Sequence, residues 1–250
     1  ALGWGPVMTR LVVLQHLERE GPGLFAREAQ ARGWELRICR LDQGEPLPQL
    51  GDADILLVLG GPMGVADVGS PAYPWLAPEV ALLQQVLAQG RPVIGICLGA
   101  QLLALAAGGG AVPMTHGQPP LPLRELGFGA ISWWPDPAAE PLLCGLDRSE
   151  LVLHWHGDRC LLPPGAELLA SSLHCREQAF RLGPRAVGLQ FHVEVEPAML
   201  ERWLRADRDY VVSALGAAGP EQVRAEACHW YQGVQPRWQR LIANVFDVLA

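Results

Sequence analysis

The chain of 250 residues holds 50% hydrophobic and 18% charged side chains, a composition typical of a globular protein with room for a substantial core. Its 28 glycines and 22 prolines stay below the share that marks low-complexity chains. The formal charge of −7 gives no general attraction to phosphate backbones or anionic lipid. We therefore expect neither nucleic acid nor a membrane as a partner.

The basic residues are all arginine, and the chain contains no lysine. This excludes a Walker-type phosphate loop, a lysine Schiff base and the strand lysine of protein kinases. Autonomous ATP-driven chemistry is therefore not expected, and no cofactor is predicted. Asn244 is the only asparagine, so a cysteine–histidine pair in this chain would take its orienting group from aspartate or glutamate.

The cysteines are scattered and form no CxxC pair, which favours a reducing, cytoplasmic environment over a disulfide framework. No apolar run approaches ~18 residues, so neither a membrane-spanning helix nor a signal peptide is predicted. Met8 directly precedes the first predicted strand like a natural start, which makes residues 1–7 an expected upstream extension. The six cysteines are Cys39, Cys97, Cys144, Cys160, Cys175 and Cys228.

In the first half, short apolar runs alternate with amphipathic stretches, the pattern of βαβ units whose mostly parallel sheet is covered by helices. The strand over 91–96 runs directly into a helix of small residues that ends near Ala107. The other elements predicted in chain order are a strand over 10–16, a helix over 23–32, a strand over 34–41, a strand over 54–59 and a helix over 76–88.

From about Leu123 onward, closely spaced strands follow with no linker before them, so we expect them to extend the same sheet in antiparallel or mixed fashion. These strands are predicted over 126–134, 150–156, 167–172, 179–182 and 186–192.

The C-terminal region has a helical pattern. A helix is predicted from Pro197 through about Asp209, then a break at 216–219, then an amphipathic helical stretch from Pro220 that Pro236 is expected to divide. We predict an α/β fold in which a central, mostly parallel sheet is flanked by helices. Its domain would span residues 8–197, with a helical extension over 198–250 packed on the same domain. The alternative for that extension is a helix that binds a partner's groove.

Cys97 is the first candidate for chemistry, because Gly95-Ile96-Cys97-Leu98-Gly99 places a thiol where a buried strand turns into a helix. Small flanking residues permit a sharp turn that holds a nucleophile clear of the backbone. The helix N-terminus favours the thiolate, and the amide of Leu98 would point towards an oxyanion formed at a carbonyl. A buried structural cysteine is the alternative for this motif alone.

Phe191-His192-Val193-Glu194 supplies a second element. If the strand continues, residues two apart share one side, so the carboxylate of Glu194 can orient the His192 imidazole. The imidazole could then exchange a proton with a thiol and with a leaving amine. A third element is the loop Gly60-Gly61-Pro62-Met63-Gly64, whose glycines let backbone donors approach a ligand.

Together these elements resemble the class I glutamine amidotransferases, whose pattern is a GGP-like loop, G-x-C-x-G-x-Q and a late F-H-x-E. The resemblance implies a flavodoxin-like sheet, with Cys97 as nucleophile, His192 as base and acid, and Glu194 as its orienting partner. It further implies an oxyanion hole from the amides of Gly61 and Leu98. The residues implied to bind substrate are Gly60, Gln101, Trp155, His156 and Gly157.

Two positions depart from the family pattern. Val193 stands where proline is usual. The segment Trp155-His156-Gly157-Asp158 corresponds to the family's S-H-G-D segment, with Trp155 in place of the serine. Neither position carries a reactive atom, so the departures bear on substrate preference more than on mechanism.

A rival pattern, His154-x-His156-x-Asp158, imitates the H-x-H-x-D of binuclear metallohydrolases, and zinc would accept such ligands. Arg159 follows the aspartate, however, and a guanidinium beside the site would oppose metal binding. No metal is therefore predicted. The further residues weighed as ligands are Cys160, His174 and Cys175.

The sequence predicts an enzyme that hydrolyses the side-chain amide of glutamine through a cysteinyl thioester and releases ammonia. An ammonia acceptor would have to be a separate synthetase subunit, because no synthetase domain is visible in this chain. One alternative is a γ-glutamyl peptidase or hydrolase acting on small γ-glutamyl compounds. An alternative of another class is a catalytically silent interaction protein.

Overall fold

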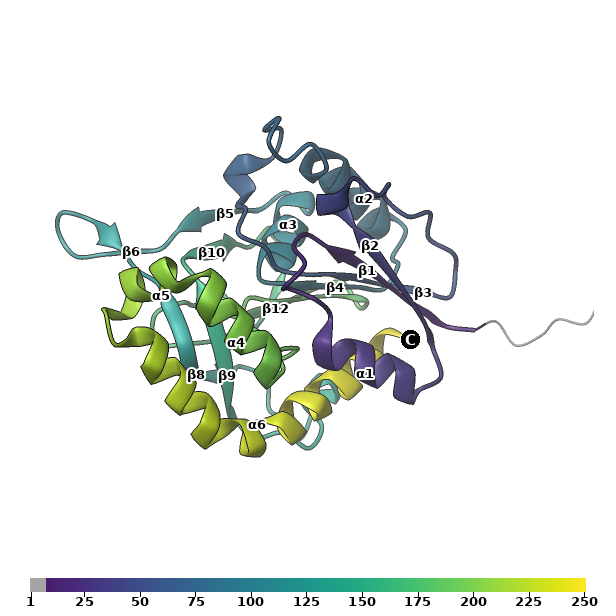
Figure 1. Ribbon diagram of the computed structural model, residues 1–250. Helices are drawn as coiled ribbons and strands as arrows, with labels where there is room; N and C mark the ends of the chain where they lie inside the picture. Colours follow the sequence, from purple (N-terminus) through teal and green to yellow (C-terminus); the bar gives the residue numbers. More distant parts are fainter. Residues whose placement is uncertain (1–7) are drawn as a thin grey trace, which may run out of the picture.

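The computed structural model describes residues 8–250, so the extension predicted for residues 1–7 lies outside the described residues. A nine-stranded sheet in the order β2-β1-β3-β4-β13-β12-β11-β8-β9 forms its centre (Figure 1). Strands β2, β1, β3, β4 and β13 run parallel, and the remaining pairings are antiparallel. The predicted sheet, with its second half extending the first, is confirmed. The strands of this sheet are β1 (Arg10–Gln15), β2 (Glu35–Arg40), β3 (Asp54–Val58), β4 (Val93–Ile96), β8 (Glu125–Trp133), β9 (Ser149–His156), β11 (Glu167–Ser171), β12 (Ala179–Leu182) and β13 (Ala186–Leu189).

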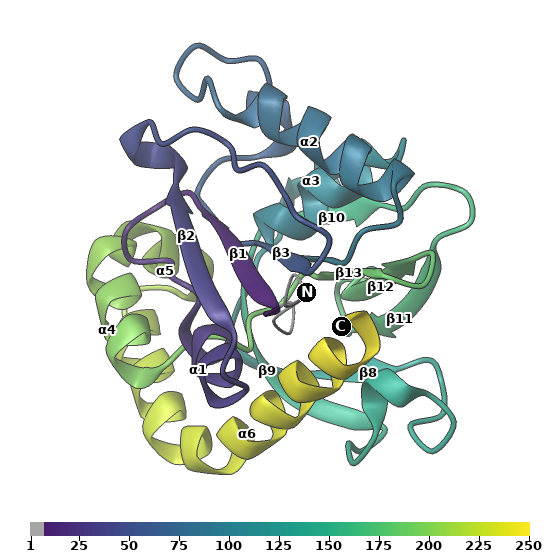
Figure 2. The same ribbon diagram turned by 90° about the vertical axis from the view of Figure 1, so that its right-hand side faces the viewer.

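Helices cover both faces of the sheet (Figures 1 and 2). Side chains of α2 and α3 join one buried hydrophobic cluster, and side chains of α1, α4, α5 and α6 join another. Strand β1 supplies both clusters alternately, because successive strand residues point to opposite faces. The helices are α1 (Gly23–Ala31), α2 (Leu76–Ala88), α3 (Leu98–Ala106), α4 (Pro197–Ala206), α5 (Arg208–Leu215) and α6 (Gly219–Leu249), with short 3-10 helices at Leu41–Gln43, Val65–Asp67 and Pro141–Leu143.

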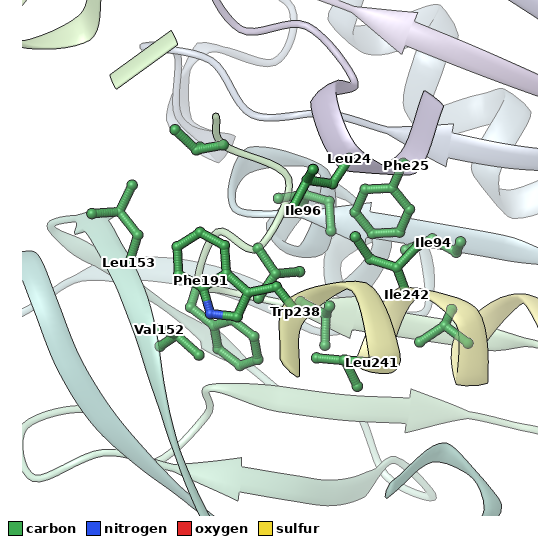
Figure 3. Close-up of a cluster of buried hydrophobic side chains, with 14 of the residues drawn as sticks. Leu24, Phe25, Ile94, Ile96, Val152, Leu153, Phe191, Trp238, Leu241 and Ile242 are labelled. Carbon is green, nitrogen blue, oxygen red and sulfur yellow. The ribbon is translucent and has the colours of Figure 1, made fainter. Parts of the chain in front are cut away.

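The larger hydrophobic cluster joins the first helix, the sheet and the last helix. Figure 3 shows Phe25 of α1 beside Ile94 of β4 and Ile242 of α6, and all three side chains are buried. Burying side chains of this size contributes roughly 1.5–3 kcal/mol each. The C-terminal helices therefore complete the same core as the sheet. No helix within residues 8–250 is both long and apolar enough to cross a bilayer.

Two helix boundaries in the C-terminal region differ from the prediction. The helix expected through Asp209 ends at Ala206, and a second helix begins at Arg208. Asp207 between them has φ −107° and ψ 27°, and its carboxylate accepts a 2.6 Å hydrogen bond from Arg19. A long-range ion pair therefore lies at the break, and nothing in the local sequence signals this pair.

The expectation that Pro236 divides the last helix was wrong. Helix α6 is continuous from Gly219 to Leu249 with Pro236 inside it, and it bends near its middle in both views (Figures 1 and 2). A proline removes one helical hydrogen bond and kinks the axis, but anchored flanking turns can keep the helix going. Val234 and Trp238 provide that anchoring, because both are buried and the Trp238 indole donates to the Leu151 carbonyl at 2.9 Å.

Two short ribbons stand outside the main sheet and were not predicted. Strands β5 (Gly110–Pro113) and β10 (Asp158–Leu161) pair antiparallel, and so do β6 (Thr115–His116) and β7 (Leu121–Pro122). Their strands are only two to four residues long, too short for a period-2 pattern to be read in the sequence.

Candidate active site

Cys97 lies at the junction of β4 and α3, as predicted. Its φ of 51° is the only positive value at a non-glycine position among residues 8–250. A side chain at Gly95 or Gly99 would meet backbone atoms at 2.5 Å and 2.1 Å, so only glycine allows strand and helix to meet this closely. The strained turn presents the thiol beyond the end of the parallel strands, with 8% of the residue exposed.

His192 and Glu194 are in contact, although the reason expected from the sequence was wrong. Strand β13 ends at Leu189, so strand alternation does not align the two side chains. Instead, an isolated bridge to Leu153 holds the His192 backbone, with His192 N–H donating to the Leu153 carbonyl at 2.8 Å. Nδ1 of His192 then lies 2.6 Å from Oε1 of Glu194, whose Oε2 accepts from the Val193 amide at 3.0 Å.

The electrostatic surroundings of His192 favour the imidazolium. Burial lowers the pKa of the ring, but the charge of Glu194 and hydrogen bonds with Cys97 and Glu194 raise it by more. The net pKa of His192 lies well above its ordinary value. The ring is therefore suited to hold a proton beside the Cys97 sulfur, which is the condition for a thiolate–imidazolium pair.

Gln190 is a contact of the thiol that the sequence did not assign a role. Its Nε2 donates to Sγ of Cys97 at 3.5 Å, and its Oε1 accepts from Nε2 of Gln101 at 3.1 Å. The Cys160 thiol also faces that Oε1 at 3.7 Å. Gln101, expected to contact substrate, reaches the cavity wall while its amide orients Gln190.

A buried ion pair supports the Gly60-Gly61 loop. Nδ1 of His16 donates to the Gly60 carbonyl at 3.0 Å, and Nε2 lies 2.8 Å from Oε1 of Glu79. Burial lowers the pKa of His16, yet the adjacent Glu79 carboxylate raises it to a net value above normal. The pair fixes one side of the loop. Glu79 lies 63 positions from His16 along the chain, so this partner could not be named from the sequence.

The predicted Trp155 segment forms another wall of the site. Trp155, His156 and Gly157 all line the cavity, as Asp158 does. The Trp155 ring meets Trp203 of α4 edge to face at 5.5 Å, and Trp203 packs the same way on His192 at 4.9 Å. The C-terminal helices thus contact the imidazole through Trp203, which the sequence did not single out.

The structure does not bring together the three residues of the His154-x-His156-x-Asp158 pattern as possible metal ligands. The structure gathers Glu125, His154 and His156, whose ligand atoms lie within 4.8 Å of one another, whereas Asp158 faces the cavity. Two imidazoles and a carboxylate are ligands that zinc accepts. Hydrogen bonds already engage His156, whose Nδ1 donates to the Asp158 carbonyl at 2.9 Å and whose Nε2 lies 3.0 Å from Glu125. Burial lowers the pKa of His154 to about 4 and keeps it neutral.

The candidate residues surround one cavity of about 550 Å³, within the range of pockets that hold small molecules. Gly60 and Glu194 stand behind its wall, beside His192. Charged side chains on the wall are Glu20, Arg124, Asp158 and Asp207. The other predicted residues on the wall are Gly61, Cys97, Leu98, Gln101, Trp155, His156, Gly157 and His192.

Sequence comparisons identify relatives for most of the chain. The profile of the family described as "Glutamine amidotransferase class-I" matches residues 24–205. The glutamine amidotransferase-like protein YfeJ of Salmonella typhimurium is 29% identical over 236 residues, covering 93% of this chain and 95% of that protein. A glutamine-hydrolyzing GMP synthase of Thermomicrobium roseum is 37% identical over 135 residues, covering 54% of this chain. The match spans only 24% of that synthase.

Solved structures match nearly the whole chain. A glutamine amidotransferase from Thermotoga maritima superposes with a TM-score of 0.82 at 25% identity, covering 96% of this chain and 97% of the other. A glutamine amido transferase from Methylobacillus flagellatus gives a TM-score of 0.80 at 25% identity, covering 97% and 96%. The C-terminal helices are therefore included in these matches.

Proposed function

Because the chain belongs to the class-I glutamine amidotransferase family, we propose that it hydrolyses the side-chain amide of glutamine through a thioester on Cys97 and releases ammonia. The observation that carries the proposal is that Cys97 and His192 line the same cavity, while Oε1 of Glu194 lies 2.6 Å from Nδ1 of His192 behind the cavity wall. A nucleophile, a base within reach and a group that orients the base are the parts that acyl transfer requires.

In the first half of the reaction, the Cys97 thiolate attacks the carboxamide carbon of glutamine. The oxygen becomes an oxyanion, for which the amides of Gly61 and Leu98 are the proposed donors. Leu98 is the first residue of α3, where backbone N–H groups have no helical partner. Gly61 lies against it, since a Cβ at Gly61 would come within 3.2 Å of the Leu98 side chain.

His192 then gives its proton to the nitrogen, the carbon–nitrogen bond breaks and ammonia leaves. In the second half, the same imidazole takes a proton from water, which attacks the thioester and releases glutamate. Glu194 keeps Nδ1 of the ring occupied throughout, so that Nε2 faces the reacting atoms.

The fate of the ammonia is a further proposal. Relatives include glutamine-hydrolyzing GMP synthases, of which this chain spans about a quarter in the Thermomicrobium roseum case. If the ammonia is transferred, a separate synthetase subunit receives it. We propose that this reaction takes place in the cytoplasm.

A second candidate function is hydrolysis of small γ-glutamyl compounds with the same thioester chemistry. The cavity of about 550 Å³ favours this candidate, because glutamine has only ten heavy atoms and a pocket in this range accommodates larger ligands. Comparing kcat/KM for glutamine and for γ-glutamyl dipeptides decides between the two.

The test of the proposed function is labelling with a glutamine-analogue electrophile followed by peptide mapping. Modification confined to Cys97, abolished in Cys97→Ala together with turnover, is the expected result. A folded protein that is neither labelled nor active on any γ-glutamyl amide would favour the silent interaction protein instead.

A further inference from the structure

Glu20 presents a carboxylate to the cavity without a protein partner. It lies in the loop between β1 and α1, and its side chain forms part of the cavity wall. Within residues 8–250, no ion pair or side-chain hydrogen bond engages its carboxylate. Glu20 is half-buried at the cavity wall, so its carboxylate is open to a hydrogen-bond donor of a molecule bound in the cavity.

The carboxylate of Glu20 converges with the two reacting side chains at Gly60. A Cβ placed on Gly60 would lie 2.8 Å from Oε2 of Glu20, 3.3 Å from Cε1 of His192 and 3.6 Å from Cβ of Cys97. Cε1 is bonded to Nε2, the ring nitrogen that exchanges protons in the proposed reaction. Glu20 therefore lies beside both reacting side chains, at the wall of the cavity that would hold the leaving nitrogen.

Charge decides which part of the substrate Glu20 can face. The oxyanion of the tetrahedral intermediate is repelled by a carboxylate and is directed to the backbone amides. The leaving amino group carries N–H bonds, which are the hydrogen-bond donors of the reacting group. An ionised acceptor makes a stronger hydrogen bond than a neutral one.

Burial raises the pKa of Glu20 to about 7, against the opposing effect of positive charge on His192 and Arg19. Carboxylate and carboxylic acid forms are thus both available near neutral pH. Asp207, the other acidic residue on that side of the cavity, is already paired with Arg19 and does not compete for the same role.

We propose that Glu20 is a further catalytic residue, which accepts a hydrogen bond from an N–H of the leaving amino group. This role rests on the proposed hydrolysis of a γ-glutamyl amide. Glu20 holds the nitrogen towards Nε2 of His192 while the imidazolium proton moves to it and the carbon–nitrogen bond breaks. No proton passes to Glu20 itself, and the ammonia leaves from its side.

The test compares two substrates that form the same thioester but differ in the leaving group. The leaving amino group of glutamine carries N–H bonds, whereas the leaving methoxy group of glutamate γ-methyl ester carries none. Glu20→Gln should lower kcat/KM for glutamine about 10- to 100-fold, as expected for loss of a hydrogen bond to a charged group, and change kcat/KM for the ester by less than about twofold. The matched control is Glu18→Gln, an exposed residue of the same loop, which should leave both values unchanged.

Equal losses on both substrates would mean that Glu20 acts through His192 or the fold, and would overturn the assignment. So would a Glu20→Gln variant with unchanged activity on glutamine. A wild-type protein that cleaves neither substrate and is not labelled at Cys97 would overturn the proposed hydrolysis itself. Alkylation of Cys97 by iodoacetamide, expected within about threefold of wild type, checks that the variant's site is intact.

Discussion

Nε2 of Gln190 donates a hydrogen bond to Sγ of Cys97 across 3.5 Å, and the amide that makes this contact is oriented from behind by Gln101. Gln190 is fully buried, as is the His192 ring two residues later. One short segment after β13 therefore brings both a hydrogen-bond donor and a base to the thiol.

We predict that Gln190→Leu slows iodoacetamide alkylation of Cys97 about three- to tenfold at neutral pH. A thiolate that loses a hydrogen-bond donor is less stable relative to the thiol. Peptide mapping separates Cys97 from the exposed Cys144 and Cys228. Cys160→Ala, which removes only a weak donor to Gln190, serves as the control and should react like wild type.

The buried His16–Glu79 pair should make stability depend on pH. Because Glu79 raises the pKa of His16 above its unfolded value near 6.5, the stabilisation is complete below about pH 6.5 and is lost as pH rises through the folded pKa. Glu79→Gln should therefore cost about 3 kcal/mol at pH 6 and less at pH 9. Urea unfolding at the two pH values measures this, and a cost that grows with pH would contradict the assignment.

The Glu20 carboxylate should lower stability at alkaline pH. Its folded pKa of about 7 exceeds the ordinary 4.5, so the folded state binds more protons between these values and wild-type stability falls as pH rises through them. Glu20→Gln should match wild type near pH 4.5 and exceed its free energy of unfolding by up to about 3 kcal/mol at pH 8. Urea unfolding of both proteins at the two pH values measures this, and an equal difference at both would contradict the assignment.

Gly60→Ala should reduce activity far more than stability. The added methyl group would come within 2.8 Å of Glu20 and 3.3 Å of His192, so it displaces groups at the reacting centre. A displacement of this size is expected to lower kcat/KM about 100-fold. Gly110→Ala meets no atom within 4 Å and provides the control, with full activity expected.

Gly233→Ala should stabilise the protein without affecting turnover. Gly233 lies inside α6, is exposed, and would accommodate a Cβ with no atom within 4 Å. Alanine is favoured over glycine in helices by about 0.5–1 kcal/mol. A rise in the free energy of unfolding of that size, with unchanged glutamine hydrolysis, is the expected result. A loss of stability would show that α6 requires glycine at this position.

The sharp turn at Cys97 could be predicted, because residues adjacent to it in the sequence determine it. Glycines on both sides of a cysteine between an apolar strand and a helix leave few alternatives to a sharp turn, and the structure has φ 51° there. The contact between His192 and Glu194 was also predicted, but for a wrong reason, since a bridge to Leu153 holds the segment.

The supporting residues could not be predicted, because distant segments supply them. Glu79 reaches His16 from α2, and Trp203 reaches His192 from α4. A single sequence carries no signal for such pairs. The same limit explains the helix break at Asp207, whose partner Arg19 lies 188 positions earlier.

The His192 ring is fixed on two sides, by Glu194 at Nδ1 and by Trp203 against the ring. Turning the ring over between half-reactions would break its hydrogen bond with Glu194. In the proposed reaction Nε2 must therefore first give a proton to the departing ammonia and then take one from the attacking water. The water must occupy the position that the ammonia has left. An added amine small enough to enter, such as hydroxylamine, would take the water's position and be acylated to a γ-glutamyl hydroxamate.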